Sequence, residues 1–362
     1  MVQEWRPMPQ KTASMKLIIQ IPCLNERAQL PETFAALPRA IDGVSEIEIL
    51  VIDDGSTDGT AELAADLGVH HLIRFPKNRG LAAAHMAGLD AALRLGADVV
   101  VNTDADNQYK GADIERLIRP IIEGRCDIAV GDRQTDTIAH FSPLKRTLQR
   151  WGSSLVRRVS GTDVSDSTSG FRAFNRRALE RLFVHNRFTY TLESIIQAGH
   201  LGLVIENVVI ETNPMTRKSR LFTGIGEYLR RNGPVIFRAY VMYRPVRTFG
   251  WIAALLLGVG LVLCSRFVVY WLMEPTVSRH IQSLLVGVGS VVLSFVVALM
   301  ALMADLMATN RRLIEELMIR TRRLDARSSD ASRRELGASE ADLIRTTAST
   351  WSADPDRVSD GR

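Results

Sequence analysis

Two carboxylates one residue apart, Asp104 and Asp106, are the side chains in this sequence best suited to chemistry. They follow the apolar run 99–101, and Gln108 lies two residues further on. Carboxylate and amide oxygens are hard ligands that suit Mg²⁺ or Mn²⁺, with a diphosphate completing the coordination. The same residue types also form turns after strands, so the motif alone leaves a metal site and a structural turn as alternatives.

Two further polar clusters follow apolar runs earlier in the chain. Asn25 and Glu26 come after the strand candidate 16–21, and Asp53, Asp54 and Gly55 come after the strand candidate 47–52. Ligands of parallel sheets bind outside the carboxyl ends of the strands. Three such clusters therefore favour a binding crevice at one edge of a sheet.

The spacing of apolar residues predicts an alternation of strands and helices. Strands are expected at 16–21, 47–52, 71–75, around 99–101, at 127–130 and at 203–210. Helices are expected at 29–41, at 114–122, at 175–183 and at 192–198, and two more are expected to end at residues 67 and 95. This order predicts an α/β fold with a doubly wound, mostly parallel sheet.

Charge, motifs and cysteine spacing disfavour several classes of protein. The net charge of +5 is small for 362 residues, which gives little support to a nucleic-acid partner. No Gly-x-Gly-x-x-Gly opens a helix, and this disfavours a dinucleotide enzyme. The three cysteines show no metal spacing and suggest a reducing compartment. Residues 1–14 lack the apolar core of a signal peptide.

Two long apolar runs, 249–273 and 281–303, predict a pair of membrane-spanning helices. Both runs are apolar all round, unlike the one-sided helices of a soluble core. Arginines precede and follow the pair, so the positive-inside rule places both flanks in the cytoplasm. The basic stretch 143–160 fits either a solvated helix or a surface helix near anionic lipid.

Five motifs resemble those of family 2 glycosyltransferases with the GT-A fold, over roughly residues 16–220. They begin at Pro22, Asp53, Asn78, Asp104 and Ser169, and they occur in the family's order. The similarity is to the polyprenyl-phosphate branch, which includes dolichyl-phosphate mannosyltransferases, and the two-helix anchor agrees with its bacterial members.

The resemblance implies roles for individual residues. It implies that Asp106 and Gln108 hold Mg²⁺ or Mn²⁺, and that Arg133 and Arg172 grip phosphate groups. The implied catalytic residues are Asp104, Asp106, Arg133 and Arg172. The implied nucleotide-sugar site comprises Pro22, Asn25, Glu26, Asp53, Asp54, Gly55, Asn78, Gly80 and Asp104. A basic loop with Arg217, Lys218 and Arg220 lies where the branch closes on the phosphates, although it lacks the branch's aromatic and glycine.

The implied reaction is the inverting transfer of one sugar from a UDP- or GDP-sugar to polyprenyl (undecaprenyl) phosphate. The acceptor phosphate is mostly a dianion at neutral pH, because its second pKa lies near about 6, so no strong general base is needed. Glu193 is the leading acidic residue beyond the metal site, with a structural cap or ion pair as its expected role.

Two alternatives remain open from the sequence. The first is a family 2 enzyme that elongates a glycolipid or polysaccharide, although the Gln-x-x-Arg-Trp motif of processive synthases is absent. The second is a non-catalytic scaffold for a flippase, which the intact Asp104, Asp106 and Gln108 disfavour.

The expected organisation is a flexible N-terminus (1–14), a catalytic domain (15–220), juxtamembrane interfacial helices (221–247) and two transmembrane helices (248–304). A cytoplasmic helix and tail (305–362) complete it, and the Ser- and Asp-rich composition beyond Arg320 predicts disorder there. The expected location is the inner (plasma) membrane, with the catalytic domain in the cytoplasm. The resemblance also implies a homo-oligomer, since bacterial relatives are often tetramers.

Overall fold

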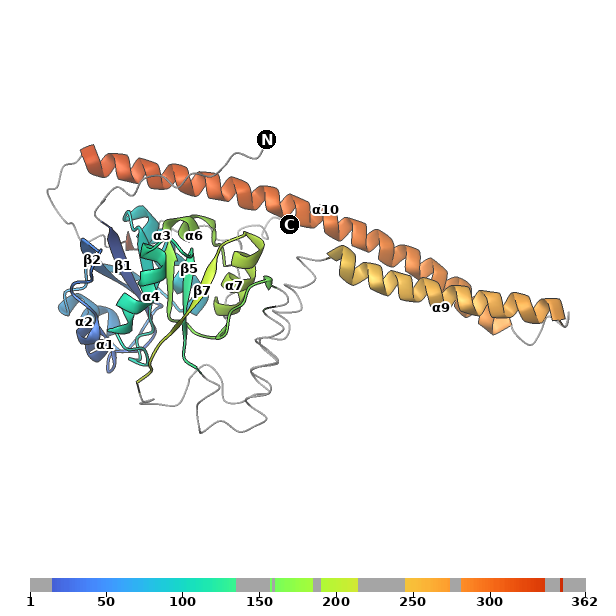
Figure 1. Cartoon of the computed structure of the whole chain (residues 1–362), viewed down its shortest axis with the longest axis horizontal. Helices are drawn as coiled ribbons and strands as arrows, with labels where there is room; N and C mark the ends of the chain where they lie inside the picture. The colour runs from blue at the N-terminus through green and yellow to red at the C-terminus, as the bar shows by residue number, and fades with distance from the viewer. Residues whose placement is uncertain are drawn as a thin grey trace, which may run out of the picture. The chain divides into compact units, whose positions relative to one another are not determined.

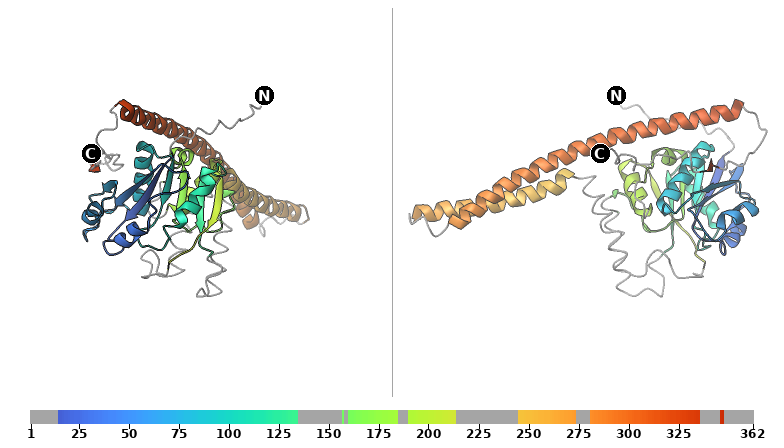
Figure 2. Two further views of the ribbon diagram at one scale, coloured as in Figure 1. Left: turned by 60° about the vertical axis from the view of Figure 1, so that its left-hand side comes forward. Right: turned by 180° about the vertical axis from the view of Figure 1, so that it is seen from behind.

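The computed structural model describes residues 15–134, 157, 160–184, 190–213, 245–273, 281–335 and 346–347. Two compact units divide the chain: Met1–Ile225 with Thr321–Arg362, and Gly226–Arg320. The first unit is a sheet with helices on both faces, and the second is a pair of long helices (Figures 1 and 2). The expected surface helix (apart from residues 157 and 160) and most of the juxtamembrane segment lie outside the described residues.

The sheet of the first unit has eight strands in the order β7-β5-β6-β4-β1-β2-β3-β8. The strands are β1 (Lys16–Cys23), β2 (Glu46–Asp53), β3 (His71–Arg74), β4 (Val99–Asn102), β5 (Ile128–Asp132), β6 (Arg172–Asn175), β7 (Ile205–Val209) and β8 (Thr346–Thr347). Every pairing is parallel except those of β6, which is antiparallel to both β4 and β5. The predicted doubly wound, mostly parallel sheet is confirmed.

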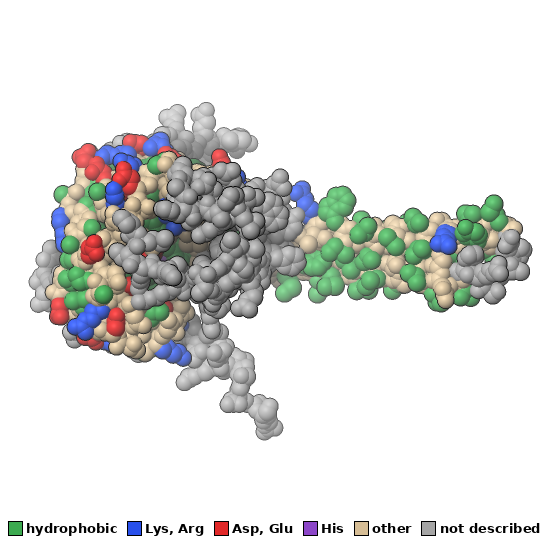
Figure 3. Space-filling model, turned by 90° about the horizontal axis from the view of Figure 1, so that it is seen from below, with side chains coloured by type: hydrophobic (Ala, Val, Ile, Leu, Met, Phe, Trp, Pro, Cys, Tyr) green, Lys and Arg blue, Asp and Glu red, His purple; other side chains and the backbone are tan. Residues whose placement is uncertain are grey.

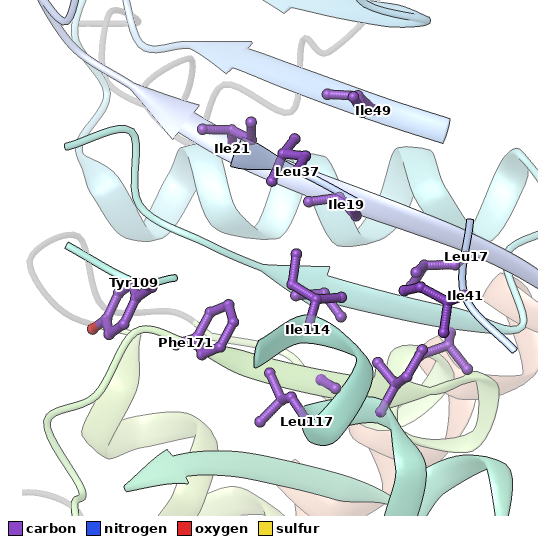
Figure 4. Close-up of a cluster of buried hydrophobic side chains, with 14 of the residues drawn as sticks. Leu17, Ile19, Ile21, Leu37, Ile41, Ile49, Tyr109, Ile114, Leu117 and Phe171 are labelled. Atoms are coloured by element: carbon purple, nitrogen blue, oxygen red, sulfur yellow. The ribbon is translucent and has the colours of Figure 1, made fainter. Parts of the chain in front are cut away.

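The alternating side chains of β1 divide the core between the two faces of the sheet. Leu17, Ile19 and Ile21 belong to a buried cluster with Ile114 of α4 (Asp113–Ile122) on one face (Figure 4). On the other face, α3 (Leu81–Arg94) comes so close that a Cβ at Gly88 would lie 2.3 Å from Gln20 Oε1. The remaining helices of this unit are α1 (Leu30–Ala36), α2 (Thr60–Asp66), α6 (Arg176–Arg181) and α7 (Thr191–His200).

Strand β6 is the element that the sequence did not predict. No strand was expected between 127–130 and 203–210, but Arg172–Asn175 pairs with β4 and β5. Four residues with polar ends are too few to show a strand period. Because β6 runs antiparallel, it starts at the edge where β4 and β5 end, and residues 160–171 therefore reach that edge.

The second unit consists of α9 (Pro245–Met273) packed antiparallel against part of α10 (Ile281–Glu335). Small residues allow close contact: a Cβ at Gly260 would lie 2.8 Å from the Gly287 carbonyl oxygen, and Ser294 Oγ donates to Ala253 O at 3.0 Å. Both helices are long and apolar enough to cross a membrane, and many exposed hydrophobic side chains lie along them (Figure 3). Helices that pack through small residues while exposing large apolar ones are typical of membrane hairpins.

The end of α10 belongs to the first unit. The sequence predicted disorder beyond Arg320, and this is wrong for residues 321–335, which are helical. Arg322 forms an ion pair with Asp90 of α3 at 2.5 Å and lies 3.8 Å above the Phe183 ring. Arg323 pairs with Glu180 of α6 at 2.7 Å. These tertiary contacts stabilise a helix whose composition alone predicts disorder.

Candidate active site

The loops that follow β1, β2 and β4 meet around the buried thiol of Cys23. Burial raises the pKa of Cys23 well above its ordinary value, and the neighbouring carboxylates of Glu26, Asp53 and Asp104 raise it further. Carboxylates on three different loops can repel the same thiolate only if they lie close to it. The three polar clusters seen in the sequence therefore share one edge of the sheet.

The turn after β2 is fixed by its own polar side chains. Asp54 accepts hydrogen bonds from the backbone N–H groups of Arg79 (2.7 Å) and Gly80 (2.9 Å), which joins this turn to the start of α3. Gly55 has a φ of +75°, and a Cβ there would lie 2.6 Å from the carbonyl carbon of Lys77. Only glycine fits this close approach of two backbones.

Asn25 serves the same turn from the β1 side. Its backbone N–H donates to Ser56 Oγ at 2.8 Å, and its Oδ1 accepts from the Thr57 N–H at 2.9 Å. Both Asn25 and Asp54, expected to bind the donor, thus organise the loops that line the site. Asn78, another expected donor residue, is exposed just before Gly80.

Asp53 lies deeper than a surface ligand would. Its side chain is fully buried, and its Oδ1 accepts from the Ser56 N–H at 3.1 Å. Its Oδ2 has no hydrogen-bond partner in the described part of the chain and lies 3.7 Å from Arg74 Nε. A buried carboxylate oxygen without a hydrogen bond is an acceptor that a hydroxyl or N–H of a ligand can satisfy.

Asp104 and Asp106 lie together beyond β4, where a cation is favoured. Burial and, to a smaller extent, the nearby Asp106 together raise the pKa of Asp104 to about 7, whereas Arg133 opposes the shift. Two carboxylates in one buried place repel each other unless a positive charge lies between them. The described residues contain no group of three or more His, Cys, Asp or Glu side chains that could hold a metal ion. Mg²⁺ bound by one or two carboxylates and substrate phosphates needs no such group, so the pair fits this type of ion.

The turn that carries Asp106 and Gln108 is held in place by residues after β7. Asn107 has a φ of +56°. Asn213 holds this turn through two hydrogen bonds of 2.9 Å: its Nδ2 donates to Asn107 O, and its backbone N–H donates to Gln108 O. Asp106 Oδ1 accepts from the Gln108 N–H at 3.3 Å. The backbone around both expected metal ligands is thus fixed by the protein itself.

Arg133 follows β5 at the same edge. Its Nε donates to Asp166 Oδ2 at 2.7 Å, and its Nη2 donates to Asp166 Oδ1 at 3.1 Å and to Thr168 Oγ1 at 2.8 Å. Burial would lower the pKa of Arg133, but Tyr109, Asp166 and Asp104 outweigh it and raise the pKa. The guanidinium therefore stays charged beside the carboxylates of the site.

Arg172 does not lie where the resemblance implied. Its side chain is fully buried, and it donates to the carbonyl oxygens of Ser169 (2.9 Å), Thr191 (2.8 Å) and Ser167 (3.0 Å) and to Ser194 Oγ (2.7 Å). Burial lowers its pKa to about 10, so it remains protonated at neutral pH. With its three nitrogens all engaged, Arg172 is a structural cation, and the geometry does not support the expected phosphate contact.

A buried polar network surrounds the end of β4, next to the site. Asn102, the last residue of β4, donates from Nδ2 to Gly170 O at 2.8 Å and to Tyr190 Oη at 2.9 Å. Its Oδ1 accepts from Gln20 Nε2 at 2.8 Å and lies 2.9 Å from His85 Nδ1. Burial lowers the pKa of His85 to about 3, so the ring is neutral. This network fixes the strand end that presents Asp104.

Gly170 closes the site against Asp104. A Cβ at this position would lie 3.1 Å from Asp104 Oδ2 and 2.9 Å from Tyr190 Oη. The Gly170 N–H donates to Tyr109 Oη at 3.1 Å, and Tyr109 stacks on Phe171 with ring centroids 4.9 Å apart (Figure 4). The Ser169–Gly170–Phe171 motif therefore brings the loop before β6 against the carboxylate pair.

Four further residues singled out in the sequence are not part of this described site. Arg217, Lys218 and Arg220 fall outside the described residues. Glu193 lies partly buried in the first turn of α7, where a carboxylate interacts favourably with the helix dipole. No role was expected for Asp166, Thr168 and Tyr190. The only signal for Asp166 and Thr168 was the polar run before Phe171, which becomes informative once β6 is known to be antiparallel, and Tyr190 had none.

Comparison with known proteins gives the family. The family described as "Glycosyl transferase family 2" matches residues 18–183. The undecaprenyl-phosphate mannosyltransferase of Micrococcus luteus is 34% identical over 207 residues, which cover 54% of this chain and 83% of that protein. The polyprenol monophosphomannose synthase of Mycolicibacterium smegmatis is 32% identical over 176 residues, covering 47% of this chain and 65% of that protein.

Among solved structures, glucosyl-3-phosphoglycerate synthase from Mycobacterium tuberculosis, in complex with Mn²⁺, UDP-glucose and phosphoglyceric acid, resembles the chain with a TM-score of 0.49. It is 19% identical, and the match covers 66% of this chain and 85% of that one. The family match spans all five motifs. The chain belongs to glycosyl transferase family 2.

Proposed function

We propose that this chain transfers one sugar from a UDP- or GDP-sugar to a polyprenyl phosphate such as undecaprenyl phosphate. The relatives named for undecaprenyl-phosphate mannosyl transfer and polyprenol monophosphomannose synthesis support this acceptor class. Donor sugar and chain length are left to experiment, since the described residues give no sugar-specific contact.

The observation that carries the proposal is the meeting of carboxylates and a guanidinium at one sheet edge. Asp104 interacts electrostatically with Asp106, Glu26 and Arg133, which come from the loops after three different strands. A negative pair beside a positive guanidinium suits a substrate with both a cation-bound diphosphate and a further phosphate.

The chemistry requires no strong base. An oxygen of the acceptor phosphate, mostly dianionic at neutral pH, attacks C1 of the sugar from the side opposite the leaving group. A bond forms between that oxygen and C1, the bond between C1 and the diphosphate oxygen breaks, and the nucleoside diphosphate leaves with the electron pair. Attack from the opposite side inverts the anomeric centre.

Asp106 and Gln108 are the residues that would hold Mg²⁺ or Mn²⁺ in this proposal, with Asp104 beside them at the nucleotide sugar. A bound divalent cation stabilises the negative charge that grows on the departing diphosphate. Asp53 and Glu26 would accept hydrogen bonds from the nucleoside, and Arg133 would donate to a phosphate oxygen. Arg217, Lys218 and Arg220 remain proposed acceptor contacts on the basis of the resemblance alone.

The acceptor lipid agrees with the two apolar helices. A polyprenyl phosphate stays in the bilayer, so an enzyme that uses it gains from an anchor in the same membrane. We propose that α9 and the first part of α10 cross the inner (plasma) membrane and leave the catalytic domain on the cytoplasmic side. The proposal includes a homo-oligomer, which light scattering of the detergent-solubilised chain would test.

The direct test is transfer from a panel of radiolabelled UDP- and GDP-sugars to undecaprenyl phosphate in membranes, with and without EDTA. We expect one donor to yield a lipid-linked monosaccharide and EDTA to abolish the product. A product with several sugars would instead indicate the elongating alternative.

A matched pair of variants tests whether the chain is catalytic. Asp106→Ala should abolish transfer while membrane insertion persists, whereas Asp66→Ala, at an exposed carboxylate on α2, should leave transfer unchanged. Full activity of Asp106→Ala would disprove the metal assignment, and a wild-type chain without any transfer would favour the scaffold alternative.

A further inference from the structure

The buried carboxylate of Asp166 is not accounted for by the proposed chemistry. It lies in the loop before β6, its side chain is 2% exposed, and both oxygens accept from one edge of the Arg133 guanidinium. Thr168 completes the group: its N–H and its hydroxyl donate to Asp166 Oδ1 at 3.2 and 2.8 Å. Such a two-bond fork fixes both the position and the plane of a guanidinium.

The fork leaves one edge of Arg133 available. Nε and Nη2 carry all the hydrogen bonds of this side chain to described residues, and Nη1 carries none. The side chain is 23% exposed, so part of it is accessible to solvent. Arg133 also interacts with Asp104, a carboxylate of the proposed donor site, so its charge acts at that site.

The loop has a second support besides the ion pair. Ser165 N–H donates to Asn207 Oδ1 at 3.0 Å, and Asn207 Nδ2 donates to the Asp163 carbonyl oxygen at 2.6 Å, so β7 anchors it. These bonds to β7 hold the loop that carries Asp166, the residue that supports the Arg133 guanidinium.

We propose that Asp166 is a positioning residue that holds Arg133 by its Nε–Nη2 edge so that Nη1 donates to a substrate phosphate oxygen. This inference rests on the proposed function. The phosphate belongs either to the donor diphosphate or to the acceptor lipid, because the same donor edge recognises both. Thr168 restrains the carboxylate from the other side, and neither residue touches the substrate.

The test is a double-mutant cycle on the full chain in detergent, read by calorimetry. The variants are Asp166→Asn, Arg133→Ala and the two combined, with Asp163→Asn as the matched control because that aspartate is exposed in the same loop. The ligands are UDP and GDP with Mn²⁺ in one arm, and a short-chain prenyl phosphate in the other.

We expect Asp166→Asn to weaken binding in at least one arm by about tenfold or more, as for a lost hydrogen bond to a charged group. The combined variant should bind no more weakly than Arg133→Ala, because Asp166 acts only through Arg133. Loss in the nucleotide arm assigns Nη1 to the donor, and loss in the prenyl phosphate arm assigns it to the acceptor. Asp163→Asn should bind like the wild type.

Two results would overturn the proposal: wild-type binding by Asp166→Asn in both arms, or additive losses in the combined variant. A lower melting midpoint of Asp166→Asn with normal binding would show a purely structural role and also overturn it. A parallel transfer assay separates this inference from the function. If the binding losses are non-additive but the chain transfers no sugar, only the proposed function is refuted. If the chain transfers sugar but the binding losses are additive, only the positioning role of Asp166 is refuted.

Discussion

Arg133 and Arg172 both bond to the loop before β6, yet their surroundings differ completely. Arg133 bonds to one buried carboxylate, is 23% exposed, and has no hydrogen bond from Nη1 to the described residues. Arg172 is fully buried and donates to three carbonyl oxygens and a hydroxyl, with no ion pair within 4.0 Å among the described residues. One arginine is available to a ligand, and the other replaces water for backbone groups that would otherwise be unsatisfied.

The difference shows that an arginine in a family motif does not by itself mark a phosphate site. Burial decides what the guanidinium can reach. A charge without a carboxylate partner survives burial only when several dipoles point at it, and the loop before β6 supplies them to Arg172. The comparison leads to four predictions.

The largest effect should come from Arg172→Met, which removes the donor to the carbonyl oxygens of the buried residues Ser167 and Ser169. We expect a loss of about 3–5 kcal/mol in the free energy of unfolding, because buried acceptors without partners are costly. Urea unfolding of the solubilised chain measures it. The control Arg125→Ala removes a half-exposed surface arginine and should cost no more than about 1 kcal/mol. A stable Arg172→Met chain that cannot bind phosphate would reverse the comparison.

Arg133→Ala should act mainly on activity. We expect transfer to fall by about 10²–10³-fold, the range seen when one positioned donor to a developing negative charge is removed. The steady-state rate at saturating substrate measures it, with the folded fraction checked by circular dichroism. A fall that only matches the unfolded fraction would make Arg133 structural, like Arg172.

A third arginine tests whether a buried ion pair outside the site contributes to stability. Arg322 pairs with Asp90, donates to the carbonyl oxygens of Leu179 and Leu182, and lies over the Phe183 ring. Arg322→Ala should lower the free energy of unfolding by about 2–3 kcal/mol, because Asp90 is left buried without its partner. Limited proteolysis should also cleave near residues 321–335 faster. Unchanged stability and protection would show that the end of α10 does not depend on this pair.

The smallest effect concerns pH. Burial would raise the pKa of Asp166, but Arg133 and Thr168 outweigh it and lower the pKa below its ordinary value of 3.8. The pair therefore contributes its full stability above about pH 3.8, and this contribution disappears as pH falls through the lower, folded-state pKa. The stability difference between wild type and Asp166→Asn, followed from pH 7 to pH 2, should shrink at the acid end. The corresponding difference for Arg172→Met should stay constant there, since its carbonyl partners do not titrate.

Much of the fold could be predicted because its signals are local. The apolar runs before Asp53 and Asp104 are long enough to identify buried strands, and their order requires parallel pairing. The short strand β6 and the helical end of α10 could not be predicted in this way. The first has only four residues, and the second depends on Asp90 and Glu180, which lie more than a hundred residues away in sequence.

The sequence by itself determined which residue types meet at the sheet edge, because strand order brings the ends of β1, β2 and β4 together. The tertiary structure alone decided what each of them does. Asn25 and Asp54 became loop supports, Arg172 became a buried structural cation, and Asp166 became the partner of Arg133. The physical reason is that a polar side chain's role depends on which groups satisfy its hydrogen bonds, and those groups come from distant parts of the chain.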